Sequence, residues 1–181
     1  MDKFQEVSVP VKFTLQGKLD FMNLKPRFET FKGMVLIGLH RKMSMAQNQT
    51  YELWKEFGPL RKALAPEANL YAIEIYPDTD FFQKFSPLRE FEKWAAIPKS
   101  GVDEVPDALS EIEIPVGEYA VFSYQGKPSE AQATFQYIYG EWLPKSEYEM
   151  DARPYFALMD ENYKGEHPDS KEEFWIPIKK K

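Results

Sequence analysis

Residues 34–59 read MVLIGLHRKMSMAQNQTYELWKEFGP, and residues 119–144 read YAVFSYQGKPSEAQATFQYIYGEWLP. The SMAQ of the first stretch returns as SEAQ in the second, at an offset of 85 residues (129 − 44). Without a gap, the same offset aligns residues of one class well beyond these four, among them Leu53 with Ile138, Trp54 with Tyr139, Phe57 with Trp142, Tyr71 with Phe156 and Ala72 with Ala157. A series of this length predicts an internal duplication.

Each copy predicts the same order of secondary-structure elements. Ser44 and Ser129 lie where a helix N-cap is expected, and a glutamine follows each of them three residues later, which is the pattern of a capping box. We expect each helix to end or kink at Pro59 or Pro144, because proline lacks the N–H that a helix needs. A strand precedes each helix and two strands follow it; the predicted strands are residues 34–40, 69–77 and 91–99 in the first copy and 119–124, 154–163 and 172–180 in the second.

This order predicts an α+β fold in which a duplicated strand–helix–strand–strand module forms a largely antiparallel sheet with two main helices. One domain is expected to hold both copies, which are joined by a loop rich in Pro, Asp, Ser and Gly. The predicted boundaries are an N-terminal arm and first strand at 1–30, the domain at 31–178 with repeats at about 31–98 and 111–178, and a basic tail in solvent at 179–181.

The composition excludes several classes of function. The 181 residues include no cysteine, which rules out disulfides, iron–sulfur clusters and thiol catalysis. A net charge of −6 argues against a nucleic-acid partner, and neither a membrane span nor a signal-peptide core is found in the sequence. His40 and His167 do not form a metal-binding pattern, so we expect no metal and no cofactor. A cytoplasmic protein is therefore expected.

Aromatic residues gather on one face of each predicted helix. Phe135, Tyr139 and Trp142 are spaced as i, i+4 and i+7, and Trp54 and Phe57 occupy the equivalent face of the first helix. Packing in the core is one interpretation of these rings. The other is that they line a cleft between the two copies, because tryptophan and tyrosine are favoured where one edge stays in water and because such clefts are common ligand sites.

Strand alternation extends the second interpretation to the sheet. Glu74 and Tyr76 share one face of a strand, and Ala157 and Met159 share the equivalent face in the second copy. Glu74 is either a solvent-facing acid of an edge strand or a pocket acid that awaits a cationic or hydrogen-bonding ligand. The residues predicted to bind a ligand are Trp54, Phe57, Glu74, Tyr76, Phe135, Tyr139, Trp142, Phe156, Ala157 and Met159.

Four stretches resemble the GyrI-like, or AraC-type effector-binding, family: FKGMVLIGLHRKMS (31–44), YAVFSYQG (119–126), WLPKSEYEMDARPYF (142–156) and EEFWIPI (172–178). The resemblance covers the chain from about residue 30 to residue 178. It implies a duplicated module with a curved sheet and an aromatic-lined pocket between the halves. Members of the family are ligand-sensing parts of bacterial transcription regulators, gyrase-inhibitor-like proteins or stand-alone binders, and a few hydrolyse strained cyclopropane-bearing compounds.

The sequence departs from the family pattern at Ala157, where members commonly carry a glutamate that reads cationic ligands or supports catalysis. The loss puts both roles in doubt at this position, and Glu74 and Glu141 are the acids that could substitute in part. The helix-turn-helix segment of the regulators has no counterpart in the sequence, which favours a stand-alone effector-binding module.

Three functions are compatible with these features. The first is binding of a small hydrophobic, aromatic or weakly cationic ligand in a multidrug-type cleft. The second is hydrolysis of hydrophobic electrophilic compounds, for which Glu74 and Tyr139 are the candidate catalytic groups. The third is a gyrase-inhibitor-like interaction with another protein. The sequence leaves the ligand, the occurrence of catalysis and the oligomeric state open.

Overall fold

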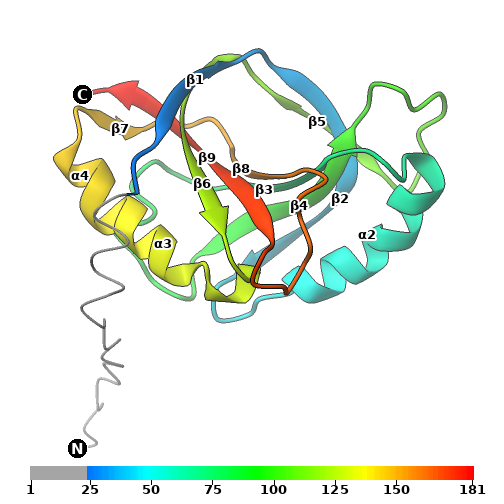
Figure 1. Cartoon of the computed structure of the whole chain (residues 1–181), viewed down its shortest axis with the longest axis horizontal. Helices are drawn as coiled ribbons and strands as arrows, with labels where there is room; N and C mark the ends of the chain where they lie inside the picture. The colour runs from blue at the N-terminus through cyan, green and yellow to red at the C-terminus, as the bar shows by residue number, and fades with distance from the viewer. Residues whose placement is uncertain (1–23) are drawn as a thin grey trace, which may run out of the picture.

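The computed structural model describes residues 24–181 (Figure 1), so that most of the predicted N-terminal arm lies outside the described residues. The strands are β1 (Arg27–Phe31), β2 (Met34–Ser44), β3 (Leu70–Ile75), β4 (Glu90–Pro98), β5 (Ser110–Ile114), β6 (Gly117–Gln125), β7 (Tyr148–Met150), β8 (Tyr155–Met159) and β9 (Lys171–Lys180). The helices are α2 (Thr50–Leu64), the 3-10 helix η1 (Pro128–Glu130), α3 (Gln132–Tyr137), the π-helix η2 (Ile138–Trp142) and α4 (Leu143–Lys145).

The sheet is antiparallel and its strand order is symmetric. Hydrogen-bonded neighbours follow the order β1-β6-β9-β8-β3-β4-β2-β5, and β7 adds to β9. When each of these eight strands is exchanged for its counterpart in the other half, the same order results, read from the opposite edge of the sheet; β7 has no counterpart. At its centre β3 pairs with β8, and Ala72 lies opposite Ala157, the residue with which the 85-residue offset aligns it. The predicted α+β fold, with a large antiparallel sheet and two helices, is confirmed.

The outermost strands are exchanged between the halves. β1 pairs with β6 of the second half, and β5 pairs with β2 of the first half, in one continuous register from Phe31–Gly117 to Met34–Ile114. Only Lys32 and Gly33 separate β1 from β2, and Gly33 takes a φ of 84° that suits glycine. Figure 1 shows these segments arching over one face of the sheet, which therefore curves around an inner core.

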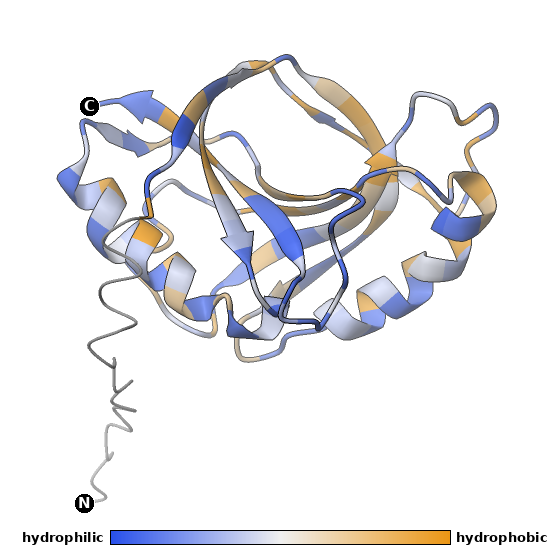
Figure 2. Ribbon diagram, viewed as in Figure 1, coloured by the Kyte–Doolittle hydropathy of each residue, from blue (hydrophilic) through white to orange (hydrophobic). Residues whose placement is uncertain are grey.

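Alternation along the strands divides the apolar residues between the two faces of the sheet. The inner face holds the cluster Leu36, Tyr71, Ile73, Trp94, Ala96, Ile114, Tyr119, Val121, Phe156 and Trp175. The outer face carries two further clusters, one under α2 around Leu53 and Phe57 and one under α3 around Ile138 and Phe174. Figure 2 shows that both helices alternate between hydrophilic and hydrophobic residues, as expected for helices that cover one face of a sheet.

The predicted start of the first helix is wrong, and the helix does not end at Pro59. Ser44 ends β2, and its Oγ accepts the N–H of Gln47 at 3.1 Å in the turn before α2, which begins five residues later than the capping box predicts. Pro59 lies inside α2, which runs on to Leu64. Burial of Leu53 and Phe57 against the sheet holds this helix together, so that tertiary packing outweighs the local effect of proline.

The second helical segment also begins differently from the prediction. Ser129 lies in η1, and the α-helical turns begin only at Gln132. The segment ends near the predicted position, since α4, which holds Pro144, stops at Lys145. The predicted basic tail also differs, since β9 extends through Lys180, which pairs with Tyr148 of β7.

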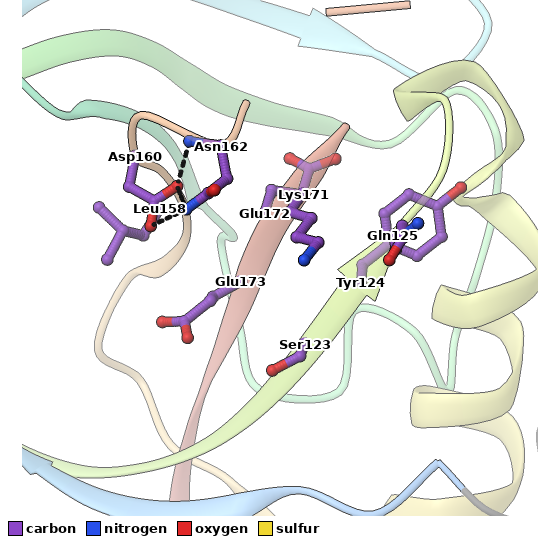
Figure 3. Close-up of a pocket in the computed structure, with 9 residues that line it drawn as sticks. All are labelled: Ser123, Tyr124, Gln125, Leu158, Asp160, Asn162, Lys171, Glu172 and Glu173. Atoms are coloured by element: carbon purple, nitrogen blue, oxygen red, sulfur yellow. Dashed lines mark hydrogen bonds between the residues drawn. The ribbon is translucent and has the colours of Figure 1, made fainter. Parts of the chain in front are cut away.

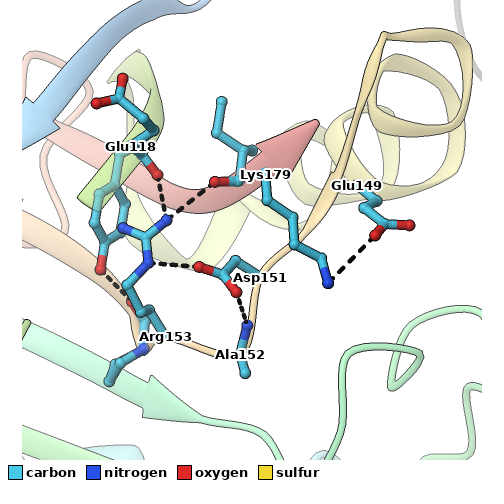
Figure 4. Close-up of polar contacts among 9 residues, drawn as sticks. Glu118, Glu149, Asp151, Ala152, Arg153 and Lys179 are labelled. Carbon is cyan, nitrogen blue, oxygen red and sulfur yellow. Dashed lines mark hydrogen bonds and ion pairs between the residues drawn. The ribbon is translucent and has the colours of Figure 1, made fainter. Parts of the chain in front are cut away.

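Arg153 ties the end of the sheet together, as Figure 4 shows. Its Nε donates to Asp151 at 2.6 Å, and its Nη2 donates to the carbonyls of Glu118 and Ile178 at 2.8 and 3.0 Å. Its guanidinium also lies 4.7 Å from the ring centre of Tyr119. Gly117 makes room for this side chain, because a Cβ there would lie 2.0 Å from Arg153 Nη1.

We predict that Gly117→Ala lowers the free energy of unfolding by about 1–3 kcal/mol, because the added methyl group displaces the Arg153 guanidinium. Gly58→Ala is the matched control: it adds the same methyl group in α2, where no atom lies within 4 Å, and should stabilise by about 0.5–1 kcal/mol. Urea unfolding of both variants measures the two changes. Equal stability of Gly117→Ala and the wild type would contradict the packing of Arg153 against Gly117.

No helix within residues 24–181 is both long and apolar enough to cross a membrane.

Candidate functional site

A cleft of about 580 Å³ opens on the outer face of the sheet, above the central strands β3 and β8. Ala72 and Ala157 lie side by side in its floor. Trp54 of α2 stands on one side and Phe135 of α3 on the other. Figure 1 shows that α2 and the η1–α3 segment begin near each other and then diverge. The two small side chains leave the sheet low at this point, so that the surrounding rings enclose a hollow.

The loop before β9 completes the rim of the cleft. Tyr163 and Glu166 of this loop line it, together with Ser129 of η1. The carboxylate of Glu166 accepts the N–H and the Oγ–H of Ser129 at 3.1 and 2.6 Å. These bonds fix the loop to the start of the second helical segment, and this contact shapes the opening.

Five of the ten residues predicted to bind a ligand line this cleft: Trp54, Glu74, Phe135, Ala157 and Met159. They come from α2, β3, α3 and β8, so that the structure brings together elements from both halves of the chain. Strand alternation on β3 and β8 explains the three strand residues, which all point to the helix side of the sheet.

The structure places the other five outside the lining. Phe57 of α2 is fully buried in the cluster between this helix and the sheet. Phe156 points to the inner face and stacks on Trp175 with ring centres 5.2 Å apart. Trp142 packs against Phe122 at 5.0 Å. The remaining two, Tyr76 and Tyr139, both contact Phe82 in the loop between β3 and β4. Their ring centres lie 4.9 and 3.7 Å, respectively, from that of Phe82.

Glu74 is a paired acid of a central strand. Lys93 lies opposite it on β4, and the lysine Nζ donates to Glu74 Oε1 at 2.7 Å. The hydroxyl of Tyr76 donates to the other carboxylate oxygen. Both charged side chains are mostly buried, with exposed fractions of 13% for Glu74 and 16% for Lys93. The interpretation of Glu74 as an edge-strand acid is therefore excluded, because β3 has a neighbour on each side.

Three tyrosines surround this pair. Burial, and after it the negative charge of Glu74, raises the pKa of Tyr76, Tyr139 and Tyr155 well above the usual value. Their hydroxyls therefore stay protonated at physiological pH and are hydrogen-bond donors. Within the described part of the chain, the buried hydroxyl of Tyr139 has no hydrogen-bond partner.

Glu172 is a further acid of the cleft that the sequence reasoning missed. It lies on β9 two residues before Phe174, and both side chains line the cleft. Burial raises the pKa of Glu172 to about 7, although the charge of Lys93 opposes this rise. The alternation of side chains along a strand could have identified both residues. Glu172 lies two residues before Phe174 in the strand 172–178, and Lys93 lies between Phe91 and Ala95 at the same spacing, so that each shares a strand face with apolar residues.

We predict that the Glu172→Gln variant gains stability relative to the wild type as the pH rises from 5 to 8. Burial raises the pKa of Glu172 in the folded state to about 7, above its ordinary value of 4.5, so the folded wild type loses stability while Glu172 ionises in this range. The difference in the free energy of unfolding between the variant and the wild type should change by about 2–3 kcal/mol over this pH range. Urea unfolding at each pH measures it.

The exposed loop residue Glu161 supplies the control, since Glu161→Gln makes the same change in charge. A stability difference between Glu172→Gln and the wild type that does not vary with pH would contradict the burial of this carboxyl group.

A second, smaller hollow of about 360 Å³ lies at the ends of β6 and β9 (Figure 3). Some of its polar groups are already paired: Asn162 Nδ2 donates to Asp160, and Glu173 pairs with Arg27 at 2.8 Å. Among residues 24–181, no group of three or more His, Asp or Glu side chains is placed to hold a metal ion. The larger cleft, with its rings and partly buried charges, is therefore the candidate functional site.

Fold and cleft together are those of an α+β domain with a candidate small-molecule site. The family model of the GyrI-like small molecule binding domain matches residues 24–179, and the chain belongs to this family.

Among curated proteins, the chain is similar to the transcriptional regulator BrlR of Pseudomonas aeruginosa, with 24% identity over 161 residues. The match covers 86% of this chain and 56% of BrlR, so that the chain spans little more than half the length of that relative.

Two solved structures share the fold. The integron cassette protein VCH_CASS2 of Vibrio cholerae superposes with a TM-score of 0.64 at 13% identity, over 86% of this chain and 96% of that one. SAV2435, solved bound to tetraphenylphosphonium, gives a TM-score of 0.64 at 16% identity, over 86% of this chain and 94% of that one.

Proposed function

We propose that the protein binds a small hydrophobic, aromatic or weakly cationic ligand in the cleft above Ala72 and Ala157. The observation that carries this proposal is the hollow itself, which stays open between the rings of two helices. Its volume of about 580 Å³ lies within the range of small-molecule sites. Membership of the GyrI-like family and the tetraphenylphosphonium bound to SAV2435 support the same class of ligand.

The chemistry of the lining fits such a ligand. Trp54, Phe135 and Phe174 present aromatic surface, on which flat rings stack. A cationic group over one of these rings contributes about 0.5–2 kcal/mol. Because the rings provide most of the contact and directed polar groups are few, the cleft suits a range of related compounds, which is the property of a multidrug-type site.

The symmetric strand order supports an origin of the site by internal duplication. Both halves run through the same order of elements, and the central register pairs residues that the 85-residue offset aligns. A cleft that takes residues from both copies then arises at the axis between them.

Hydrolysis is the less favoured function. A general base needs a carboxylate that is free to accept a proton from water. Both oxygens of Glu74 already accept hydrogen bonds, from Lys93 and Tyr76, and Tyr139 does not line the cleft. A protein-interaction role, the third alternative, has no comparable observation in its favour.

We predict that Trp54→Ala weakens binding of tetraphenylphosphonium by about tenfold, because it removes one stacking wall of the cleft. Trp142→Ala is the matched control, since this tryptophan packs against Phe122 outside the cleft and should change stability without changing affinity. Isothermal titration measures both dissociation constants.

Thermal unfolding gives a second readout. A ligand at 100 times its dissociation constant adds about 2.7 kcal/mol of stability. If no lipophilic cation and no neutral aromatic compound shifts the melting temperature, the proposed function is wrong.

A further inference from the structure

Lys93 lines the cleft, and the proposed binding of a hydrophobic or weakly cationic ligand does not explain why a basic side chain lies there. Lys93 is the one basic residue among the described residues that line the cleft. Three lining residues are acidic: Glu74, Glu166 and Glu172. The backbone of Lys93 is held in β4 between β2 and β3, opposite Glu74 on one side. The ammonium group therefore reaches the carboxylate of Glu74 directly across the strand pair, with a distance of 2.7 Å between Nζ and Oε1.

The contact pairs the charge of the acid. Oε1 of Glu74 accepts from the Lys93 ammonium and Oε2 accepts from the Tyr76 hydroxyl, so that the negative charge already has a cation beside it and each oxygen already has one donor. Both side chains are mostly buried, and salt in the solvent screens such a pair less than it screens a surface pair. A ligand cation that approached Glu74 would have to displace the lysine or lie beside its positive charge.

From this arrangement we propose that Lys93 is a specificity-determining residue: its ammonium occupies the cation position on Glu74, and the cleft therefore prefers neutral aromatic ligands to permanent cations of the same size. The inference rests on the proposed function and narrows its ligand class.

Removal of the lysine charge should reverse the preference. Without Lys93, Glu74 keeps its bond from Tyr76 but has an unpaired charge in a mostly buried site, which a ligand cation can compensate. Glu172 is on the same face and carries a charge of the same sign when ionised. The lining would then hold acidic groups and no basic one.

The test compares two probes with three phenyl rings on phosphorus, methyltriphenylphosphonium as the cation and triphenylphosphine oxide as the neutral compound. Isothermal titration of the wild type should give a dissociation constant for the neutral probe that is no higher than that for the cation. In Lys93→Gln, the ratio of the neutral to the cationic dissociation constant should rise at least tenfold. The double variant Lys93→Gln/Glu74→Gln should return this ratio to within threefold of the wild-type value.

Lys42→Gln is the matched control. Lys42 is an exposed lysine of β2 on the opposite face of the sheet, and its substitution makes the same change in net charge. The ratio should stay at the wild-type value in this variant, so that a change confined to Lys93→Gln reports the local contact with Glu74.

Two outcomes would overturn the inference while the cleft stands as a binding site: the wild type binds the cation more tightly than the neutral probe, or the ratio in Lys93→Gln equals that of the wild type. The first needs no variant, so it decides the matter even if Lys93→Gln does not fold. Absence of binding of either probe to the wild type would overturn the proposed function together with this inference.

Discussion

Backbone hydrogen bonds between β3 and β8 join the two halves of the molecule at the centre of the sheet, with Ala72 opposite Ala157. Because both side chains are methyl groups, the outer face of the sheet is low where the two helical segments begin. The rings of Trp54 and Phe135 therefore enclose a hollow. A hollow of this kind lacks the van der Waals contacts that a filled core would make. The aromatic cluster on the inner face, which the strands β1 and β5 close, is densely packed and makes such contacts on the other side of the sheet.

The charges of the cleft follow from the same strand pairing. Glu74 and Lys93 meet because β3 and β4 are neighbours in a register that sets these two residues opposite each other. A mostly buried ion pair of this kind adds little net stability, since desolvation offsets the attraction, yet loss of one partner is strongly destabilising. Replacement of a buried ion pair by well-packed hydrophobic residues is often neutral for stability, so that stability alone does not account for this pair.

The strand–helix–strand–strand order of each copy follows from the sequence, because periodicity, turn residues and the 85-residue offset can be read along the chain. The short strands β5 and β7 were not predicted. The ends of the helices do not follow from the sequence either. Ser44 has the spacing of an N-cap and Pro59 that of a helix breaker, but β2 extends to Ser44 and α2 continues past Pro59. Pairing with β4 extends β2 as far as Ser44, and burial of apolar side chains between α2 and the sheet carries α2 past Pro59. Both are tertiary contacts, which the residues next to Ser44 and Pro59 in the sequence do not determine.

For the site, the sequence by itself determined that Glu74 and Tyr76 share one face of a strand and that Ala157 and Met159 share one face of another. It did not determine which face points toward the helices, since Phe156, which points to the inner face, was also among the predicted ligand residues. The division of the aromatic rings between wall and core was decided only by the tertiary structure, as was the contact of Lys93 with Glu74. Alternation along one strand fixes the direction of a side chain but not its neighbour. That neighbour depends on which strand lies alongside and in what register, which only the folded sheet defines.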